Sequence, residues 1–310
     1  MEFSMGALSY LILFVMVLVG VAFVTLMEQK ILAGSQIRVG PNYVGYWGLL
    51  QPFADAVKLL SKETVVSRVV SPAVYYISPV VSLSVSLVLW LIYPWGEGGL
   101  DLVFSILFFM CVSGVGVYPV LGSGWASNCK YSMLGSLRAV AQMVSYEVSL
   151  AMILLSLIWV SGSFSFKGVL ESQHMIWNIF VFFPLGYVWF VSSLAETNRT
   201  PYDFAEGESE LVSGFNTEYG SGGFTLIFMA EYASILLMSL IFSLLFLSSC
   251  FSGLSVMKGM IIAFYFVWVR ATLPRYRYDK LMSLAWKSFL PITLLMFGYY
   301  LGVGAISVVC

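Results

Sequence analysis

Eight long apolar runs divide this chain and decide what it can fold into. They lie near residues 5–27, 72–93, 101–121, 139–160, 175–195, 224–249, 254–273 and 288–309. Each has about the 20 residues that an α-helix needs to cross the hydrocarbon core of a bilayer. Only helices and closed barrels satisfy their backbone in lipid, and these runs are far longer than barrel strands. The sequence therefore predicts an all-α, polytopic bundle of about eight transmembrane helices, a single membrane domain over residues 1–310.

The composition agrees with this class and argues against several functions. The chain is 60% hydrophobic and 10% charged, whereas soluble domains carry roughly 25% charged residues. A net charge of -1 gives no indication of nucleic-acid binding. The four cysteines lie far apart without a CxxC pair, and His174 is the only histidine. A metal, iron–sulfur or haem site formed by this chain alone is therefore not expected, and no nucleotide-binding motif occurs.

The basic residues indicate how the chain is oriented in the membrane. With eight spans, both termini lie on one side, and the first, third, fifth and seventh loops lie on the other. Of the 15 basic residues, all except Lys167 and Lys258 fall in or next to these odd-numbered loops. Loops rich in Lys and Arg remain on the cytoplasmic or equivalent side of a membrane. The bias predicts that the odd loops form a polar platform facing that compartment, with the termini opposite.

The first loop, residues 34–68, contains a predicted amphipathic helix. Pro52 fits the first turn of a helix that runs to about Glu63. Asp55 and Lys58 lie on its polar face, and apolar residues occupy the other face. Two interpretations remain open: a helix that lies in the membrane interface, or a lid over a cavity with Asp55 directed into it.

Acidic residues inside the apolar runs are the stronger functional signal. Glu147 follows Arg138 by nine residues, about 13 Å along a helix, which places it near the middle of the bilayer. Glu231 lies inside the sixth run. A charge at such a depth costs at least about 2.5–3.5 kcal/mol and requires a partner, a proton or water. Glu28, at the end of the first run, is open to a purely interfacial interpretation.

The segment 196–218 collects acids at an unusual density. Six of the sixteen acids of the chain lie in it: Glu196, Asp203, Glu206, Glu208, Glu210 and Glu218. If residues 205–211 form a helix, Glu206 and Glu210 share a face and repel each other. The segment is either a solvated acidic loop or a cluster that shares protons and leads toward Glu231 and Glu147, because burial and neighbouring acids both favour a bound proton.

Five stretches carry a resemblance to a known family. They are MEQK at 27–30, RVGPNYVGYWGLLQPFADAVKLLSKE at 38–63, SLRAVAQMVSYEVSL at 136–150, AETNRTPYDFAEGESELVSGFNTEY at 195–219 and WVRATLPRYRYDKLMSLAWKSFLP at 268–291. Together, in this order, they resemble the chain 1 family of NADH–ubiquinone oxidoreductase, a membrane subunit of respiratory complex I, in its mitochondrially encoded animal form. The resemblance covers essentially the whole chain. Gln29 departs from the family, which usually has Arg at this position.

The resemblance implies roles for particular residues. Three would line or adjoin a ubiquinone chamber: Glu28, Arg38 and Asp55. The others would form the acidic coupling loop and a polar path into the membrane: Arg138, Glu147, Glu196, Arg199, Asp203, Glu206, Glu208, Glu210, Glu218, Glu231, Arg270, Arg275 and Arg277. In the last group, the three arginines of the seventh loop would meet the acidic loop or partner subunits.

The resemblance also implies a cellular setting and partners. The chain would be a subunit of a proton-translocating NADH:ubiquinone reductase in the mitochondrial inner membrane, with the odd loops in the matrix and the termini in the intermembrane space. Ubiquinone would be a substrate at its interface, while NADH, FMN and the iron–sulfur clusters would bind to partner subunits. Those partners are the quinone-module subunits of the peripheral arm and neighbouring membrane-arm subunits, with membrane lipids around them. No complete active site is expected in this chain alone.

Two other functions remain open from the sequence. One is a membrane subunit of a related hydrogenase-type complex, which shares this architecture. The other is a stand-alone ion or solute transporter with an acid-lined access route. A transporter would need neither a quinone nor a docking partner, so transport by the isolated chain would distinguish it.

Overall fold

The computed structural model describes residues 2–64, 66–93, 102–205, 207 and 212–309. Every regular element within these ranges is helical. The longer helices are α1 (Glu2–Ser35), α3 (Pro72–Leu89), α6 (Lys130–Ser161), α11 (Ser221–Phe242), α12 (Gly253–Thr272) and α14 (Leu290–Val309). The shorter helices are α2 (Gln51–Ser61), α4 (Ser105–Val115), α5 (Val117–Ala126), α7 (Phe166–Ser172), α8 (Asn178–Val181), α9 (Phe183–Glu196) and α13 (Tyr278–Leu284).

Seven stretches in the described ranges are long and apolar enough to cross a membrane. They are Leu8–Ser35, Pro72–Ile92, Ser105–Ala126, Lys130–Ser161, Ser221–Leu247, Gly253–Thr272 and Tyr278–Gly304. Each overlaps one of the eight apolar runs of the sequence. The prediction of an all-α, polytopic membrane protein is therefore confirmed, with a helix count near eight.

The fifth apolar run is the one that is absent from these seven stretches, and it forms two short helices. Helix α8 ends at Val181, and α9 begins at Phe183 with Pro184 in its first turn. A proline lacks a backbone N–H and restricts the residue before it, so an uninterrupted helix through this point is disfavoured. The 14 residues of α9 extend about 21 Å at 1.5 Å per residue. This length is too short to cross a bilayer without the preceding segment.

The third run is interrupted where its glycines and a proline lie close together. Helix α4 ends at Val115, and α5 begins at Val117, with Gly116 between them. Pro119 cannot donate a backbone hydrogen bond to Val115, four residues earlier, and its ring crowds that carbonyl. The carbonyl of Pro119 accepts a hydrogen bond from Ser78 Oγ at 3.0 Å, so α3 contacts α5 just after the break.

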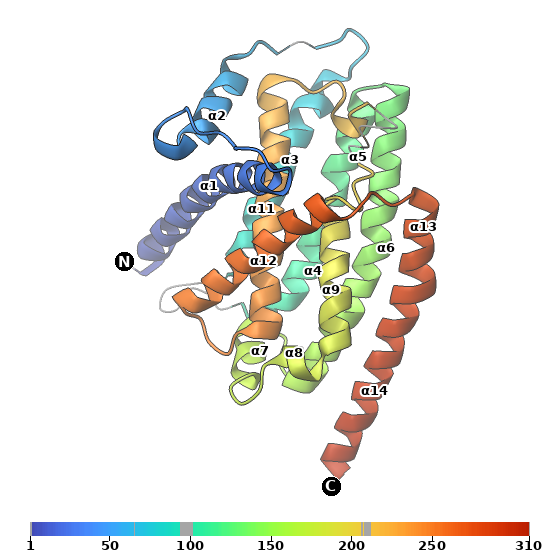
Figure 1. Ribbon diagram of the computed structural model, residues 1–310. Helices are drawn as coiled ribbons and strands as arrows, with labels where there is room; N and C mark the ends of the chain where they lie inside the picture. Colours follow the sequence, from blue (N-terminus) through green and yellow to red (C-terminus); the bar gives the residue numbers. More distant parts are fainter. Residues whose placement is uncertain (1, 65, 94–101, 206, 208–211, 310) are drawn as a thin grey trace.

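The helices form an upright bundle crossed by two tilted ones (Figure 1). Helices α3, α5, α6, α9 and α11 run side by side, whereas α1 and α12 cross the bundle at an angle. Helix α11 packs against α3, α1 and α12, and α6 packs against α5, α9 and α14. Large aromatic side chains fill the core. The ring centroid of Trp189 lies 6.4 Å from that of Phe109 and 6.4 Å from that of Phe246. This core fixes α9 between α4 and α11.

The polar loops gather at one end of the bundle. Helix α2, the segment that follows α9, and the α12–α13 connection lie at the upper end in Figure 1, opposite α7 and α8. Pro52 is in the first turn of α2, as predicted, and the helix ends at Ser61. Phe53 of α2 contacts Phe23 of α1 edge to face, with ring centroids 6.0 Å apart. Contacts of this kind hold α2 against the bundle.

Candidate functional site

A buried ionic cluster lies where α1, α11 and α12 meet. Glu28, in α1, is only 6% exposed. Its carboxylate accepts a hydrogen bond of 2.5 Å from Tyr232 Oη in α11 and forms an ion pair with Arg270 of α12. Arg199 Nη1 lies 3.9 Å from Glu28 Oε1. Glu28 is therefore a buried member of an ionic network, which contradicts a purely interfacial position at the end of its span.

Arg199 connects two carboxylates that come from different helices. Its Nη1 lies 3.9 Å from Glu28 Oε1, and its Nη2 lies 3.9 Å from Glu231 Oε2. The guanidinium also lies over the ring of Tyr232, 4.3 Å from the centroid, in cation–π geometry. Two carboxylates and two guanidiniums balance the charge of the cluster. This pairing offsets the cost of burying Glu28, Arg199 and Glu231, while the Arg270 side chain remains partly exposed.

The chain reverses direction immediately before Arg199. Helix α9 ends at Glu196, and Asn198 has a φ of 49°, a left-handed conformation that Asn tolerates better than most residues. The backbone N–H of Arg199 then donates to Leu194 O at 3.2 Å, and Tyr202 N–H donates to Arg199 O at 2.8 Å. This turn directs the Arg199 side chain toward α1 and α11.

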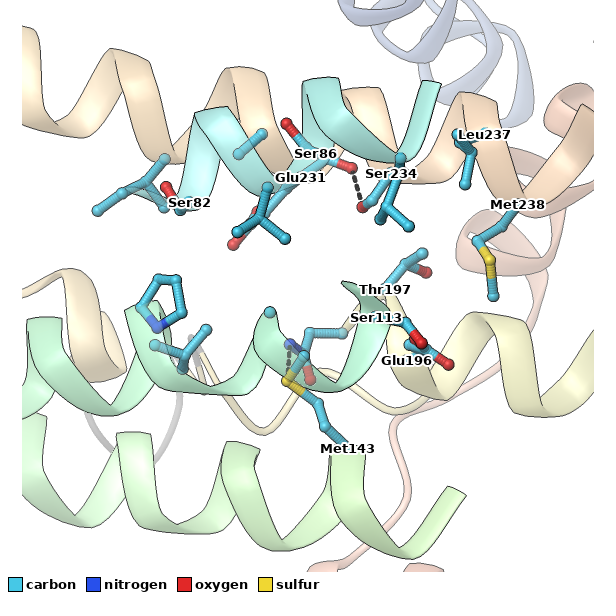
Figure 2. A pocket seen from close by; sticks show the side chains of 18 of the residues that line it. Ser82, Ser86, Ser113, Met143, Glu196, Thr197, Glu231, Ser234, Leu237 and Met238 are labelled. Carbon is cyan, nitrogen blue, oxygen red and sulfur yellow. Dashed lines mark hydrogen bonds between the residues drawn. The ribbon is translucent and has the colours of Figure 1, made fainter. Parts of the chain in front are cut away.

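A cavity of about 120 Å³, lined by both apolar and polar side chains, lies beside the cluster. Helices α3, α4, α5 and α11 and the end of α9 enclose it. Hydroxyl, amide and carboxyl groups line it together with apolar residues; the polar ones are Ser78, Ser82, Ser86, Ser113, Ser123, Glu196, Thr197, Asn198, Glu231 and Ser234. Figure 2 shows Glu231 on one side of this space and Glu196 on the other. A water needs about 10–15 Å³ of such volume, so the cavity has room for several.

Glu196 and Glu147 bring two further carboxyl groups to this region. One oxygen of Glu196, Oε2, is buried and has no hydrogen-bond partner among the described residues. Glu147, in α6, is close enough to Glu196 to act on it electrostatically. Gly114 of α4 gives room to Glu147, because a Cβ there would lie 2.9 Å from Glu147 Oε1. Two neighbouring, partly buried carboxyls favour at least one bound proton or a bridging water.

The remaining arginines of the predicted path lie around this region. The guanidinium of Arg138 lies 5.8 Å from the centroid of the Tyr278 ring, and that of Arg275 lies 4.9 Å from the centroid of the Phe204 ring. Since Phe204 belongs to the acidic segment, the structure brings the seventh loop against it. Arg277 is exposed and pairs with Asp279 at 3.1 Å.

The other predicted residues lie nearer the surface. Arg38 is exposed, and Asp55 Oδ1 accepts a 2.8 Å hydrogen bond from Gln51 Nε2 one turn earlier in α2. Asp203 is half-buried, and the main-chain oxygen of Glu218 accepts a 2.9 Å hydrogen bond from Tyr75 Oη. Glu206, Glu208, Glu210 and the helix expected over 205–211 lie outside the described residues, except for 205 and 207.

Neutral phenols hold the two ends of the acidic segment. Burial, followed by the neighbouring Tyr276, raises the pKa of Tyr202 to about 12. Burial also raises the pKa of Tyr219 to about 12. Tyr219 stacks on Tyr75 with ring centroids 4.3 Å apart, and its hydroxyl donates to Tyr75 O at 3.3 Å. Both hydroxyls remain protonated at neutral pH and add no charge, and that of Tyr219 ties the segment to α3.

Sequence reasoning missed several members of this site. Tyr232 was not singled out, although it contacts both Glu28 and Arg199. Gln142 of α6 was also missed, and its amide reaches the turn that carries Arg199. A signal was available for the cavity, because Ser78, Ser82 and Ser86 recur every four residues and so share one face of α3. The described residues contain no group of three or more His, Cys, Asp or Glu side chains placed to bind a metal ion.

Comparisons with known proteins agree on one family. The sequence model of the family described as NADH dehydrogenase matches residues 8–301. Three curated proteins, each named NADH-ubiquinone oxidoreductase chain 1, are similar over nearly their whole length. The relative from Aedes aegypti is 55% identical, with 98% of this chain and 97% of the relative covered. The relative from Locusta migratoria is 52% identical, with 97% and 96% covered. The relative from Branchiostoma lanceolatum is 50% identical, with 91% and 90% covered.

Proposed function

The chain belongs to the family of NADH-ubiquinone oxidoreductase chain 1, and from this premise we propose that it couples ubiquinone reduction to proton translocation in respiratory complex I. It acts as a core membrane subunit of the mitochondrial inner membrane. Its odd loops face the matrix, as the distribution of basic residues favours. NADH, FMN and the iron–sulfur clusters bind to partner subunits.

One observation carries this proposal. Glu28, which the family resemblance assigns to the quinone chamber, and Glu231, which it assigns to the proton path, lie at equal distances from Arg199. A change of charge at either carboxylate therefore changes the net electrostatic force on this cation and shifts the balance toward or away from the other carboxylate. The cluster is buried, so these attractions are screened less than they would be in water. Such an arrangement is suited to passing an electrostatic signal from one helix to the next.

The coupling follows from the protons that quinone reduction consumes. Each electron that reaches ubiquinone is accompanied by the uptake of a proton. When a proton leaves or enters Glu28, the pull of this residue on Arg199 and Arg270 changes. Arg199 then moves relative to Glu231, which lines the cavity. Water in the cavity, together with Glu196 and Glu147, would carry the resulting proton shift toward α6.

The surface near α1 and α2 supports the assignment of the quinone entrance. Phe23 and Phe53 contact each other there, and both remain substantially exposed. An exposed apolar contact between two helices suits the isoprenoid tail of ubiquinone. Asp55 and Arg38, on the same loop, would lie toward the head group.

The first loop also has the character of a docking surface. Ile37, Tyr43, Tyr46 and Trp47 are all largely exposed. A large contiguous patch of exposed apolar and aromatic side chains is typical of a surface that binds another protein or a membrane. Because the loop lies at the polar end of the bundle, we assign this surface to the quinone-module subunits of the peripheral arm.

A single substitution tests the proposed function. Glu231→Gln preserves the shape of the side chain and removes its charge, so the assembled complex should lose most NADH:ubiquinone activity and retain NADH oxidation by an artificial soluble acceptor. Glu171→Gln, at an exposed position of α7 at the opposite end of the bundle, is the matched control and should change neither activity. An assembled Glu231→Gln complex with parental NADH:ubiquinone activity would refute the proposal.

A further inference from the structure

Gln142 is a fully buried polar side chain in the middle of α6. It is 0% exposed. Its Nε2 donates to Ala195 O at 2.7 Å and to Tyr202 O at 2.8 Å. A side-chain amide nitrogen carries two hydrogens, so these two bonds use its full donor capacity. Both partners are carbonyl oxygens, and this fixes which end of the amide faces them.

The two carbonyls lie on either side of Arg199 in the sequence. Ala195 is in the last turn of α9, and Tyr202 follows the chain reversal. One amide therefore holds both ends of the turn that presents Arg199. The outer side of the turn is held from the α12–α13 connection, where Tyr276 N–H donates to Pro201 O at 3.1 Å. Gln142 holds the turn from α6, the helix that carries Glu147, and Met143 of the same helix accepts a hydrogen bond of 3.8 Å from Asn198 Nδ2 in the turn.

Arg199 depends on the placement of its backbone. Both of its carboxylate contacts are 3.9 Å long, beyond the 2.7–3.2 Å range of an N–H···O hydrogen bond. The guanidinium lies between Glu28 and Glu231, over the ring of Tyr232. Its equal distances follow from where the turn lies, and a displaced turn would favour one carboxylate over the other.

We propose that Gln142 is a positioning residue for proton coupling, holding the turn 195–202 so that Arg199 remains midway between Glu28 and Glu231. This inference rests on the proposed function of the chain. It assigns to Gln142 the role of tying α6 to the ionic cluster. The other end of its amide supports this role, because Oε1 is buried and has no hydrogen-bond partner among the described residues. The two N–H donors of the Gln142 amide, and not its oxygen, therefore hold the turn.

The test compares two buried glutamines in the assembled complex. Gln142→Met preserves length and volume and removes both donors. Gln173→Met is the matched control, because Gln173 is also 0% exposed and its Nε2 donates to Leu244 O at 2.9 Å at the opposite end of the bundle. Misplacing a positioned group by about 1 Å can lower a rate by up to about a hundredfold. We expect NADH:ubiquinone activity to fall about tenfold in Gln142→Met and to remain near parental in Gln173→Met.

A double variant separates positioning from general destabilisation. If Gln142 acts through Arg199, adding Gln142→Met to an Arg199→Met complex causes no further loss of NADH:ubiquinone activity. Independent, multiplicative losses would overturn the inference, as would parental activity in Gln142→Met. Where Gln142→Met prevents assembly, Gln142→Asn retains the amide but is too short to reach both carbonyls. It should give a smaller loss that also disappears in the Arg199→Met background, and additive losses there would overturn the inference.

The outcomes also distinguish this inference from the proposed function. If Arg199→Met and Glu231→Gln lower NADH:ubiquinone activity but Gln142→Met does not, only the role of Gln142 is wrong. If Arg199→Met and Glu231→Gln both retain parental activity, the proposed function fails, and the positioning role fails with it.

Discussion

Removing the charge of Glu28 should destabilise the protein more than removing that charge together with the charge of Arg270. The substitution Glu28→Gln preserves the side-chain shape but leaves two guanidiniums near a single carboxylate, Glu231. The cluster then has a net charge of one in a buried setting. The double variant Glu28→Gln with Arg270→Gln restores the balance between Arg199 and Glu231. Stability should therefore recover partly when the second charge is removed.

The structure sets the size of the effect. Two unit charges 3.9 Å apart, the Arg199–Glu28 distance, attract by about 4 kcal/mol at an effective dielectric constant of 20. Breaking one side of a buried ion pair typically costs about 3–5 kcal/mol. Two features reduce the cost here: Arg199 keeps Glu231 at the same 3.9 Å distance, and the Arg270 side chain is 32% exposed and reaches water. We expect about 3 kcal/mol for Glu28→Gln, the lower end of that range.

Thermal stability of the assembled complex measures this difference. Parental, Glu28→Gln, Arg270→Gln and double-variant complexes would be heated in parallel, and the fraction still assembled would be followed on native gels. The single variants should lose assembly at lower temperatures than the double variant. A double variant whose loss equals the sum of the two single losses would refute the reasoning, because it would mean that the two charges do not compensate each other.

Three further predictions address the first loop, the topology and the packing. Asp55→Asn should slow quinone reduction while NADH oxidation by an artificial soluble acceptor remains intact; equal loss of both activities in an assembled complex would indicate a structural role. Single cysteines at Ser61 and Ser172, in a cysteine-free chain, should react with membrane-impermeant reagents from opposite faces of sealed vesicles, and labelling from one face would contradict the topology. Gly124→Ala should lower the yield of assembled complex, because its Cβ would lie 2.1 Å from Ser136 Oγ and overpacking costs about 1–3 kcal/mol; an unchanged yield and thermal stability would show that α5 and α6 can separate without cost.

The fold was predictable where hydrophobicity alone decides it. Seven of the expected spans appear because an apolar run of such length satisfies its backbone in lipid only as a helix. Pro52 and the glycines near Gly116 gave local signals for the start of α2 and for the break between α4 and α5. The interruption at Phe182 was missed, although Pro184 was a signal for it, because hydropathy does not report a helix break within an apolar run.

The sequence indicated which residues belong to the site but not which of them contact one another. Glu28 and Glu231 could be singled out because charges in or near spans are costly, whereas Arg199 and Arg270 were assigned to the site only by the family resemblance. Their association could not, because Glu28 and Arg270 are 242 positions apart in sequence and meet only through helix packing. Gln142 lacked any signal, since a glutamine in a membrane helix gives no indication of which backbone carbonyls it reaches. The crowding of Glu206, Glu208 and Glu210 stays a prediction, as they lie outside the described residues.

The measurement that tests the central claim most directly is the number of protons translocated per electron by an assembled complex carrying Glu147→Gln. Glu147 lies within α6, beside Gly114 and near Glu196, and Gln preserves its shape while removing its ability to bind and release a proton. If buried carboxyls carry the proton shift, reconstituted vesicles should lose most proton pumping and the quinone-linked NADH oxidation coupled to it, while NADH oxidation by a soluble acceptor continues. Pumping at the parental rate and stoichiometry would contradict this role for Glu147 and for the path that leads to it.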